Sequence, residues 1–349
     1  MPNRFLTIGA MIMTILGVSF ADPIRADGLS TCVLDPTASA LKLVPVGSLS
    51  GKDLPEHARI PELSGLTVAT EPGGQTTFWT LSNEKKKLYP ISIPGLSDKV
   101  DVAQVPIALK PKKYAKELEG LTFVPASASD PAGIVLISEK LKKGGAVLRA
   151  DFNGALTDKP RYLSEMKGYD TIVDPSEQSG QTLADYFQSS DSNDGLEGIT
   201  YRPDRNVFYL LKEKSPAILI EVDGDLESVL SMTVLNCGSY KKACAGEAPF
   251  PSTLPGSDKV LDFSGLTYDP DRQKLWIVSD TGRSIFLYDP EERTAGAFPL
   301  KIAGQCVEKA EGIAFLPRSA TRLQDALLVV NDQEKISDNL LAAYWIMPL

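Results

Sequence analysis

Histidine is almost absent from this chain, with His57 the single example in 349 residues, and cysteine is scarce, with four. One histidine excludes any site built from a pair of histidines, and no cluster of His and Cys has the spacing of a zinc or copper site. The chain also lacks a Gly-x-Ser-x-Gly elbow, a His-Glu-x-x-His motif and a glycine-rich phosphate loop. These gaps exclude the commonest hydrolase, metalloprotease and nucleotide-binding signatures.

Positive charge is also in deficit, since 36 Lys and Arg stand against 45 Asp and Glu, for a net charge of −9. The lysines that do gather, at 85–87, 110–116 and 140–143, form no continuous basic stripe, and we interpret them as solvated turns. An acidic chain without such a stripe is a poor ligand for phosphate backbones. We therefore expect no nucleic-acid partner.

Long apolar runs are confined to the N-terminus, where Arg4 precedes the run Phe5 to Phe20. Ser-Phe-Ala at 19–21 fits the small-x-small cleavage rule, so we interpret residues 1–21 as a secretory signal peptide cleaved after Ala21. No later run approaches the ~20 residues of a membrane helix. We expect a soluble, periplasmic or secreted protein with no transmembrane segment in the mature chain. The segment before Cys32 only faintly resembles a lipoprotein box, so lipidation is not expected.

What the chain does have is a repeat. Five short segments place a serine or a glutamate before a glycine, an aliphatic residue and then Thr or Ala: 62–67, 117–122, 195–200, 262–267 and 309–314. Each is followed by a second apolar segment that ends on an acid or an amide: 79–83, 135–139, 209–213, 276–280 and 328–332. Strand pairs that recur in this way are typical of a radial repeat. The pattern predicts a β-propeller.

Further strands complete the predicted blades. Third strands are expected at 88–93, 146–151, 217–222, 284–289 and 341–346, and weaker fourth strands at 100–107, 160–164, 228–235 and 297–302. The last repeat has no fourth strand, so we predict that the apolar segment 41–46 joins the last blade and closes the ring. The expectation is an all-β domain over 22–349 with five four-stranded blades.

Two segments exceed this plan, at about 167–194 and 237–258, and we interpret both as rim insertions. A degenerate sixth blade is the alternative interpretation of the first. Its aromatic residues Tyr169, Tyr186 and Phe187 are candidates for ligand contact on a polar rim. By contrast, we expect Trp79, Trp276, Phe208 and Tyr209 to pack between blades.

The four cysteines predict two disulfides in an oxidising compartment. Cys237 and Cys244 bracket a polar loop in the second insertion and are natural partners. That pairing leaves Cys32 with Cys306, which a closed ring would bring together near the junction of its two ends.

Acidic side chains recur at two places in the repeat, just before the glycine and at the end of the second strand. Because paired strands are antiparallel, both places lie at the same end of a blade. We therefore expect a ring of oxygen ligands around one mouth of the channel, formed by Glu119, Glu139, Glu197, Glu213, Asp280, Glu311 and Asp332. Asn83, Lys140, Lys212 and Lys214 are expected at the adjoining rim.

A ring of carboxylates in a partly desolvated channel either has raised pKa values or binds a cation. Hard oxygen donors in a flexible circle suit Ca²⁺. The alternative is structural, in which these acids accept hydrogen bonds at strand ends or pair with Lys140, Lys212 and Lys214. Both interpretations stay open at this point.

These repeats resemble the SdiA-regulated family of exported bacterial β-propellers. The resemblance rests on Leu-Ser-Gly-Leu-Thr at 63–67, Leu-Glu-Gly-Ile-Thr-Tyr-Arg-Pro at 196–203, Lys-Glu-Lys-Ser-Pro at 212–216, Phe-Ser-Gly-Leu-Thr-Tyr-Asp-Pro at 263–270 and Ala-Glu-Gly-Ile at 310–313. Phytase-like or esterase-like propellers are the nearest rival. The resemblance implies a propeller of unsettled biochemical role, and a fold alone implies no reaction.

Two functional hypotheses follow. In the first, the propeller binds a divalent cation at the channel mouth and a small molecule or protein at the rim. In the second, the chain is a metal-dependent hydrolase, a phytase-like phosphoesterase, an esterase or a lactonase, in which the ion activates water and a ring carboxylate acts as base. A monomer is consistent with either.

Overall fold

A computed structural model describes residues 41–50, 60–70, 76–82, 85–91, 106–114, 116–127, 131–139, 144–176, 179–188, 195–214, 216–238, 248–254, 258–302, 305–318, 324–332 and 340–348. They lie in one compact unit, Cys32–Leu349. The predicted signal peptide and its cleavage site lie outside the described residues. Within these ranges no helix is both long enough and apolar enough to cross a bilayer.

The described residues form five four-stranded antiparallel sheets and one two-stranded sheet. Blade 1 contains β2 (Leu63–Thr70), β3 (Thr76–Ser82), β4 (Lys87–Ile91) and β5 (Ile107–Ala108). Blade 2 contains β6 (Leu118–Val124), β7 (Gly133–Ser138), β8 (Ala146–Ala150) and β9 (Arg161–Tyr162). Blade 3 contains β10 (Leu196–Arg202), β11 (Val207–Lys212), β12 (Ala217–Asp223) and β13 (Val229–Asn236).

Blade 4 contains β14 (Gly265–Asp269), β15 (Lys274–Ser279), β16 (Ser284–Asp289) and β17 (Thr294–Pro299). Blade 5 contains β20 (Ala310–Leu316), β21 (Ala326–Asn331), β22 (Leu340–Pro348) and β1 (Leu41–Ser50). The small sheet pairs β18 (Lys301–Ile302) with β19 (Gln305–Cys306). Short 3₁₀ helices at Lys112–Tyr114 and Leu163–Glu165 and one α-helix, α1 (Leu183–Gln188), complete the described elements.

The predicted closure of the ring is confirmed. Strand β1 pairs antiparallel with β22, from Leu41 opposite Pro348 to Ser50 opposite Leu340, with one irregularity between Pro45 and Gly47. The N-terminal strand therefore becomes the outer strand of the last blade. Strand β22 is therefore paired on both sides, and β1 takes its place as the outer edge strand of the blade.

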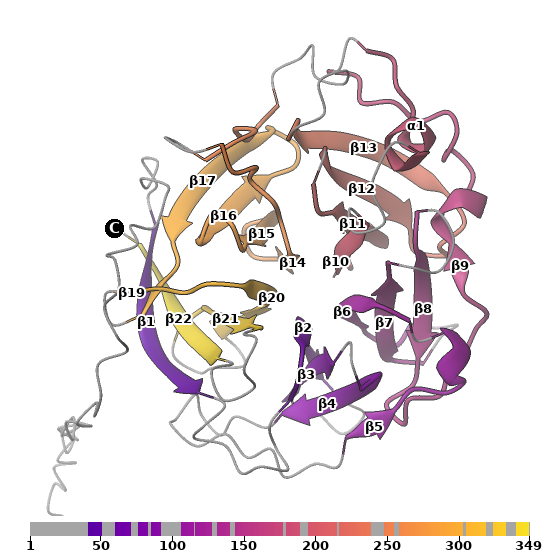
Figure 1. The fold of residues 1–349 in the computed structure, drawn as a ribbon. Helices are drawn as coiled ribbons and strands as arrows, with labels where there is room; N and C mark the ends of the chain where they lie inside the picture. The colour runs from indigo at the N-terminus through magenta and orange to yellow at the C-terminus, as the bar shows by residue number, and fades with distance from the viewer. Residues whose placement is uncertain are drawn as a thin grey trace, which may run out of the picture. The chain divides into compact units, whose positions relative to one another are not determined.

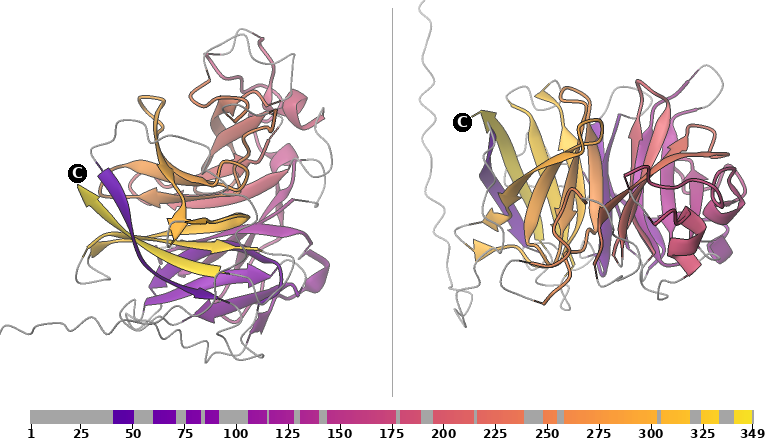
Figure 2. Two further views of the ribbon diagram at one scale, coloured as in Figure 1. Left: turned by 60° about the vertical axis from the view of Figure 1, so that its left-hand side comes forward. Right: turned by 90° about the horizontal axis from the view of Figure 1, so that it is seen from above.

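The first strands of the five blades surround a common axis (Figure 1). Strand β2 contacts β6 and β20, strand β10 contacts β6 and β14, and β14 contacts β20, so the circle is complete. The repeat threonines join neighbouring blades: Thr67 Oγ1 accepts from the amide of Phe123 at 3.1 Å, and Thr200 Oγ1 accepts from that of Tyr268 at 2.9 Å. The other two views show the strands of each blade side by side (Figure 2).

The core lies between the blades. Trp79, from blade 1, packs with apolar residues of blade 2, and Trp276, from blade 4, packs with those of blade 5. Phe208 and Tyr209 point to opposite faces of blade 3, and each joins a different cluster. The expectation that these four residues pack between blades is confirmed.

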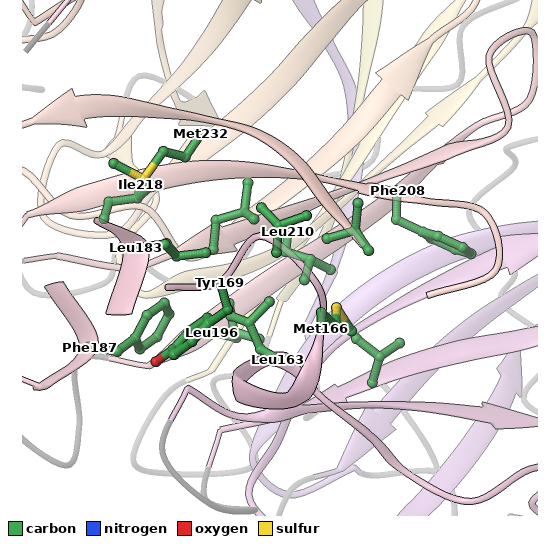
Figure 3. Close-up of a cluster of buried hydrophobic side chains, with 14 of the residues drawn as sticks. Leu163, Met166, Tyr169, Leu183, Phe187, Leu196, Phe208, Leu210, Ile218 and Met232 are labelled. Carbon is green, nitrogen blue, oxygen red and sulfur yellow. The ribbon is translucent and has the colours of Figure 1, made fainter. Parts of the chain in front are cut away.

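The first insertion is part of the core, which corrects the expectation that its aromatic residues contact a ligand. Tyr169, Tyr186 and Phe187 are all buried against side chains of blades 2 and 3. Figure 3 shows Tyr169 and Phe187 in this cluster with Leu196 of blade 3. The rings of Tyr169 and Phe187 lie with centroids 6.3 Å apart. Burying this apolar surface stabilises the segment more than exposing it at a rim would. Helix α1 supplies most of these residues.

Cys237 and Cys306 are each disulfide-bonded. Their predicted partners, Cys244 and Cys32, lie outside the described residues, so the two pairings stay predictions.

Candidate functional site at the channel mouth

A β-bulge sets the position of each repeat glutamate. The register between the first two strands shifts between Leu118 and Gly120, and again between Leu196 and Gly198 and between Ala310 and Gly312. The residue skipped in each case is a glutamate: Glu119, Glu197 or Glu311. A bulge adds one unpaired residue and redirects its side chain. The Glu-Gly pair of the repeat therefore marks a point where the strand departs from simple alternation.

The repeat glycines form the closest approach of the five inner strands. A Cβ added to Gly120 would lie 2.9 Å from the carbonyl oxygen of Glu197 and 3.1 Å from the Cα of Gly198. Each of the other repeat glycines meets the next blade in the same way, and at Gly312 the added atom would lie 2.6 Å from Gly65 C. No side chain larger than hydrogen fits there without a shift. The repeat glycines therefore allow the backbones of adjacent blades to approach closely.

The glutamates face one another across this mouth. Burial, together with the charges of Glu119, Glu213, Glu311 and Glu139, holds the pKa of Glu197 well above its usual range. Carboxylates that repel one another in this way lie near one another, because the interaction falls with distance. The structure therefore brings together acids from blades 2, 3 and 5.

Glu311 has a similar environment. Burial raises its pKa well above the usual range, and the charges of Asp280, Glu119 and Glu213 add to this effect. Neither Glu197 nor Glu311 forms a hydrogen bond or ion pair with any residue that the structure describes. Glu119 differs, because Ser64 Oγ donates to its Oε2 at 3.1 Å. Two half-buried carboxyl groups are therefore left without a partner among the described residues.

The acids at the ends of the second strands have a different role. Glu139 Oε1 accepts from the amide of Gly195 at 3.0 Å, and Asp280 Oδ1 accepts from that of Lys309 at 2.6 Å. Each bond joins the second strand of one blade to the start of the next blade. For these two acids the contacts favour the structural interpretation that the sequence left open, in which acids accept hydrogen bonds at strand ends.

Asp332 is the most distinct of the seven. Burial and the charge of Glu62 raise its pKa, while Lys309 and the backbone of Leu63 lower it. Its Oδ1 atom is buried and accepts no hydrogen bond. The sequence placed Asp332 in the same ring, and the structure places it beside Glu62 at the junction of blades 5 and 1.

Of the predicted rim residues, two are described. Lys212 is fully buried, and its Nζ donates to the carbonyls of Lys214, at 2.5 Å, and Pro216, at 3.2 Å. Lys214 Nζ lies 2.5 Å from Glu213 Oε1. Asn83 and Lys140 lie outside the described residues.

Sequence reasoning missed Asp262, whose charge contributes to the raised pKa values of Asp280 and Glu311. Its Oδ1 accepts from the amide of Thr281 at 3.0 Å and from its hydroxyl at 2.7 Å. The signal was its position three residues before a repeat glycine, where Glu62 and Glu117 stand in blades 1 and 2.

The donor set fits a hard cation, because it offers carboxylate oxygens and neither imidazole nor thiolate. As the side chains stand, no group of three or more Asp, Glu, His or Cys within the described ranges is close enough to hold a metal ion. A cation would have to draw the glutamates inward, which the three rotatable side-chain bonds of each glutamate allow.

Several solved structures are similar to this chain. They include the PQQ-bound aldose sugar dehydrogenase of Streptomyces coelicolor, at 11% identity and a TM-score of 0.46, covering 89% of this chain and all of that one. The gluconolactonase XC5397 of Xanthomonas campestris has 11% identity and a TM-score of 0.41, again covering 89% of this chain and all of that one. Regucalcin of Agrobacterium tumefaciens, a calcium-binding protein, has 11% identity and a TM-score of 0.45, covering 88% and 96%. Similarity of this degree says nothing about chemistry.

No curated protein matches the sequence. A family model does: the one described as SdiA-regulated matches residues 173–320, which contain three of the five repeats. The family resemblance predicted from the repeat motifs is therefore confirmed for this part of the chain.

Proposed function

We propose that this protein is an exported propeller that binds one divalent cation, Ca²⁺, at the channel mouth. Glu119, Glu197 and Glu311, the three bulge glutamates, would supply the first ligands, with Glu213 beside them. The bound ion would then order this face of the ring for a small molecule or a protein at the rim. The proposed location, periplasmic or secreted, rests on the N-terminal segment alone.

The observation that carries this proposal is the uncompensated pair, Glu197 and Glu311. Both residues are half-buried, burial and neighbouring carboxylates raise both pKa values, and neither side chain has a partner among the described residues. A buried charge without a partner is costly, so such groups are paired, protonated or bound to a metal. A cation bound between them would remove their mutual repulsion.

The chemistry of the donors favours calcium over other ions. Carboxylates that come from separate blades form an adaptable set, and Ca²⁺ accepts six to eight oxygens in flexible geometry. Mg²⁺ demands a stricter octahedron and keeps several waters. The Asp and Glu ring without histidine also argues against zinc.

Isothermal titration of the chelator-treated full chain with CaCl₂ tests the proposal. One Ca²⁺ per chain is expected for the natural sequence, and Glu197→Gln with Glu311→Gln together should abolish binding. Glu292→Gln, an exposed acid outside this mouth, is the control for net charge. The proposal is wrong if the natural protein binds no Ca²⁺, or if the double variant binds it as tightly. Screening the loaded protein for ester or phosphoester turnover addresses the hydrolase hypothesis.

A further inference from the structure

We propose that Lys214 is an internal counter-cation that competes with the bound ion for Glu213 and so sets the calcium affinity of the mouth. This inference rests on the proposed function. It concerns a residue that is not itself a ligand, and it explains why blade 3 differs from the other blades at this place.

The ion pair is the first observation. Lys214 Nζ lies 2.5 Å from Glu213 Oε1, and the lysine side chain is 34% exposed while that of the glutamate is 15% exposed. Glu213 is also an electrostatic neighbour of both Glu197 and Glu311. The ammonium group therefore acts on a carboxylate that belongs to the acidic mouth.

The second observation is that the loop carrying Lys214 is held in place. Lys212 is fully buried, and its amine donates to the carbonyls of Lys214 and Pro216. In other blades the same position is a short polar residue that bonds the start of its own first strand, as Ser82 does to Pro61 and Asn331 does to Glu308. In blade 3 the long side chain of Lys212 instead binds the loop that follows the strand, so the backbone that carries Lys214 is held in place.

The partial exposure of the Lys214 side chain indicates that it adjusts the calcium affinity. A lysine that is one third exposed can move its ammonium into solvent at small cost, since a partly solvated ion pair is weak. A cation at the mouth would thus displace it from Glu213 without breaking the fold. Removing Lys214 takes away the ammonium group that competes with the ion for this carboxylate, so calcium binding should tighten by about two- to five-fold.

The chain offers a matched control. Lys274 Nζ lies 3.2 Å from Asp289 Oδ2, with side-chain exposures of 36% and 16%, and it begins β15 at the end of the blade away from the mouth. Lys274→Met removes the same charge from a similar pair. It should leave the calcium affinity close to that of the natural chain, because Lys274 and the mouth lie at opposite ends of β15 and buffer screens exposed charges over ~10 Å.

Calcium titrations of the natural chain, Lys214→Met, Lys274→Met, Glu213→Gln and the Glu213→Gln, Lys214→Met double variant decide the matter. Lys214→Met is expected to bind Ca²⁺ more tightly than the natural chain. In the Glu213→Gln background the same substitution should give no gain, so the double variant should bind like Glu213→Gln. Equal affinities for the Lys214 and Lys274 variants overturn the inference and leave the proposed function standing. A gain that persists in the Glu213→Gln background also overturns it, because Lys214 would then not act through Glu213. If the natural chain binds no Ca²⁺, both proposals fall.

Discussion

The carboxylate of Glu139, at the end of the second strand of blade 2, accepts a hydrogen bond from the amide of Gly195, where blade 3 begins, at 3.0 Å. Asp280 repeats this bond to Lys309 between blades 4 and 5. The acids at strand ends thus connect blades, whereas the bulge glutamates carry the uncompensated charge. Stability and ion binding should therefore respond to different substitutions.

Glu139→Ala should lower the free energy of unfolding by about 1 to 2 kcal/mol, because it leaves a partly buried amide without its charged acceptor. Glu139→Gln keeps a carbonyl oxygen in place and should cost less. Urea denaturation of the chelated protein measures both. Calcium affinity should change less in either variant than in Glu197→Gln. If Glu139→Ala abolished calcium binding but left stability unchanged, the two roles would have to be exchanged.

Acidification should stabilise the calcium-free protein. The pKa values of Glu197 and Glu311 are raised by burial and by neighbouring carboxylates, so the folded chain takes up protons at a pH where the unfolded chain does not. Stability must then rise as pH falls from neutrality through the folded pKa values, and this gain is complete near the unfolded value of about 4.5.

Melting temperatures in EDTA from pH 7.5 to 5 measure this effect. The double variant Glu197→Gln, Glu311→Gln should show a flatter profile, since amides do not titrate. Asp174, Asp204 and Asp289 have lowered pKa values, so their opposite contribution is lost only below about pH 3.8. An identical slope in the natural chain and the double variant would contradict the assignment.

Much of the fold is readable from the repeat, because each Gly-Leu-Thr or Gly-Ile-Thr phrase combines a close backbone approach with inter-blade packing. Antiparallel pairing predicts Glu119 and Glu139 at one end of a blade, and the charges of both raise the pKa of Glu197. Their separate roles were not predictable, since they depend on a bulge at Glu119 and on which amide of the next blade Glu139 meets. The bulge recurs with the Glu-Gly pair, but the repeat does not indicate which amide of the next blade a strand-end acid meets.

The first insertion shows a different limit. Serine, aspartate and glutamine dominate 167–194, so the segment has the composition of an exposed loop. Its few apolar residues, including Tyr169, Leu183 and Tyr186, nevertheless converge on blades 2 and 3. Composition averages over a segment, whereas burial depends on where single side chains meet a neighbouring sheet.

The ring of glycines predicts a steep steric response. Gly120→Ala would place a Cβ 2.9 Å from the carbonyl oxygen of Glu197. This oxygen belongs to the backbone, so it cannot move away unless the strand of blade 3 moves with it. A loss of about 2 kcal/mol or more is expected, with weaker calcium binding because Glu197 shifts. Gly180→Ala is the comparison, since nothing lies within 4 Å there and only its φ of +64° opposes the change. Equal losses in the two variants would show that the blades do not meet tightly at Gly120.

A buried ion pair holds the first insertion to the blades. Asp174 is fully buried, and its oxygens lie 3.0 and 3.2 Å from the guanidinium nitrogens of Arg293, while the amide of Val234 donates to it at 2.7 Å. Burial alone would raise the pKa of Asp174, but hydrogen bonds from Arg293, Val234 and Ser176 lower it. The residue therefore joins three segments: the insertion, β13 and the turn between β16 and β17.

Removing one partner should lower the free energy of unfolding by more than the ion pair contributes to it, because the remaining charge loses the partner that compensates it. We expect Asp174→Asn to lower stability by about 2 to 3 kcal/mol and to speed proteolysis of the insertion. Arg293 is partly solvated, so water moderates the cost of leaving its charge without Asp174. Asp158→Asn, an exposed acid nearby in sequence, should change neither. Adding Arg293→Met to Asp174→Asn should cost much less than Arg293→Met does alone. Fully additive losses would mean that the two side chains stabilise the insertion independently, and the ion pair would then not be what anchors it.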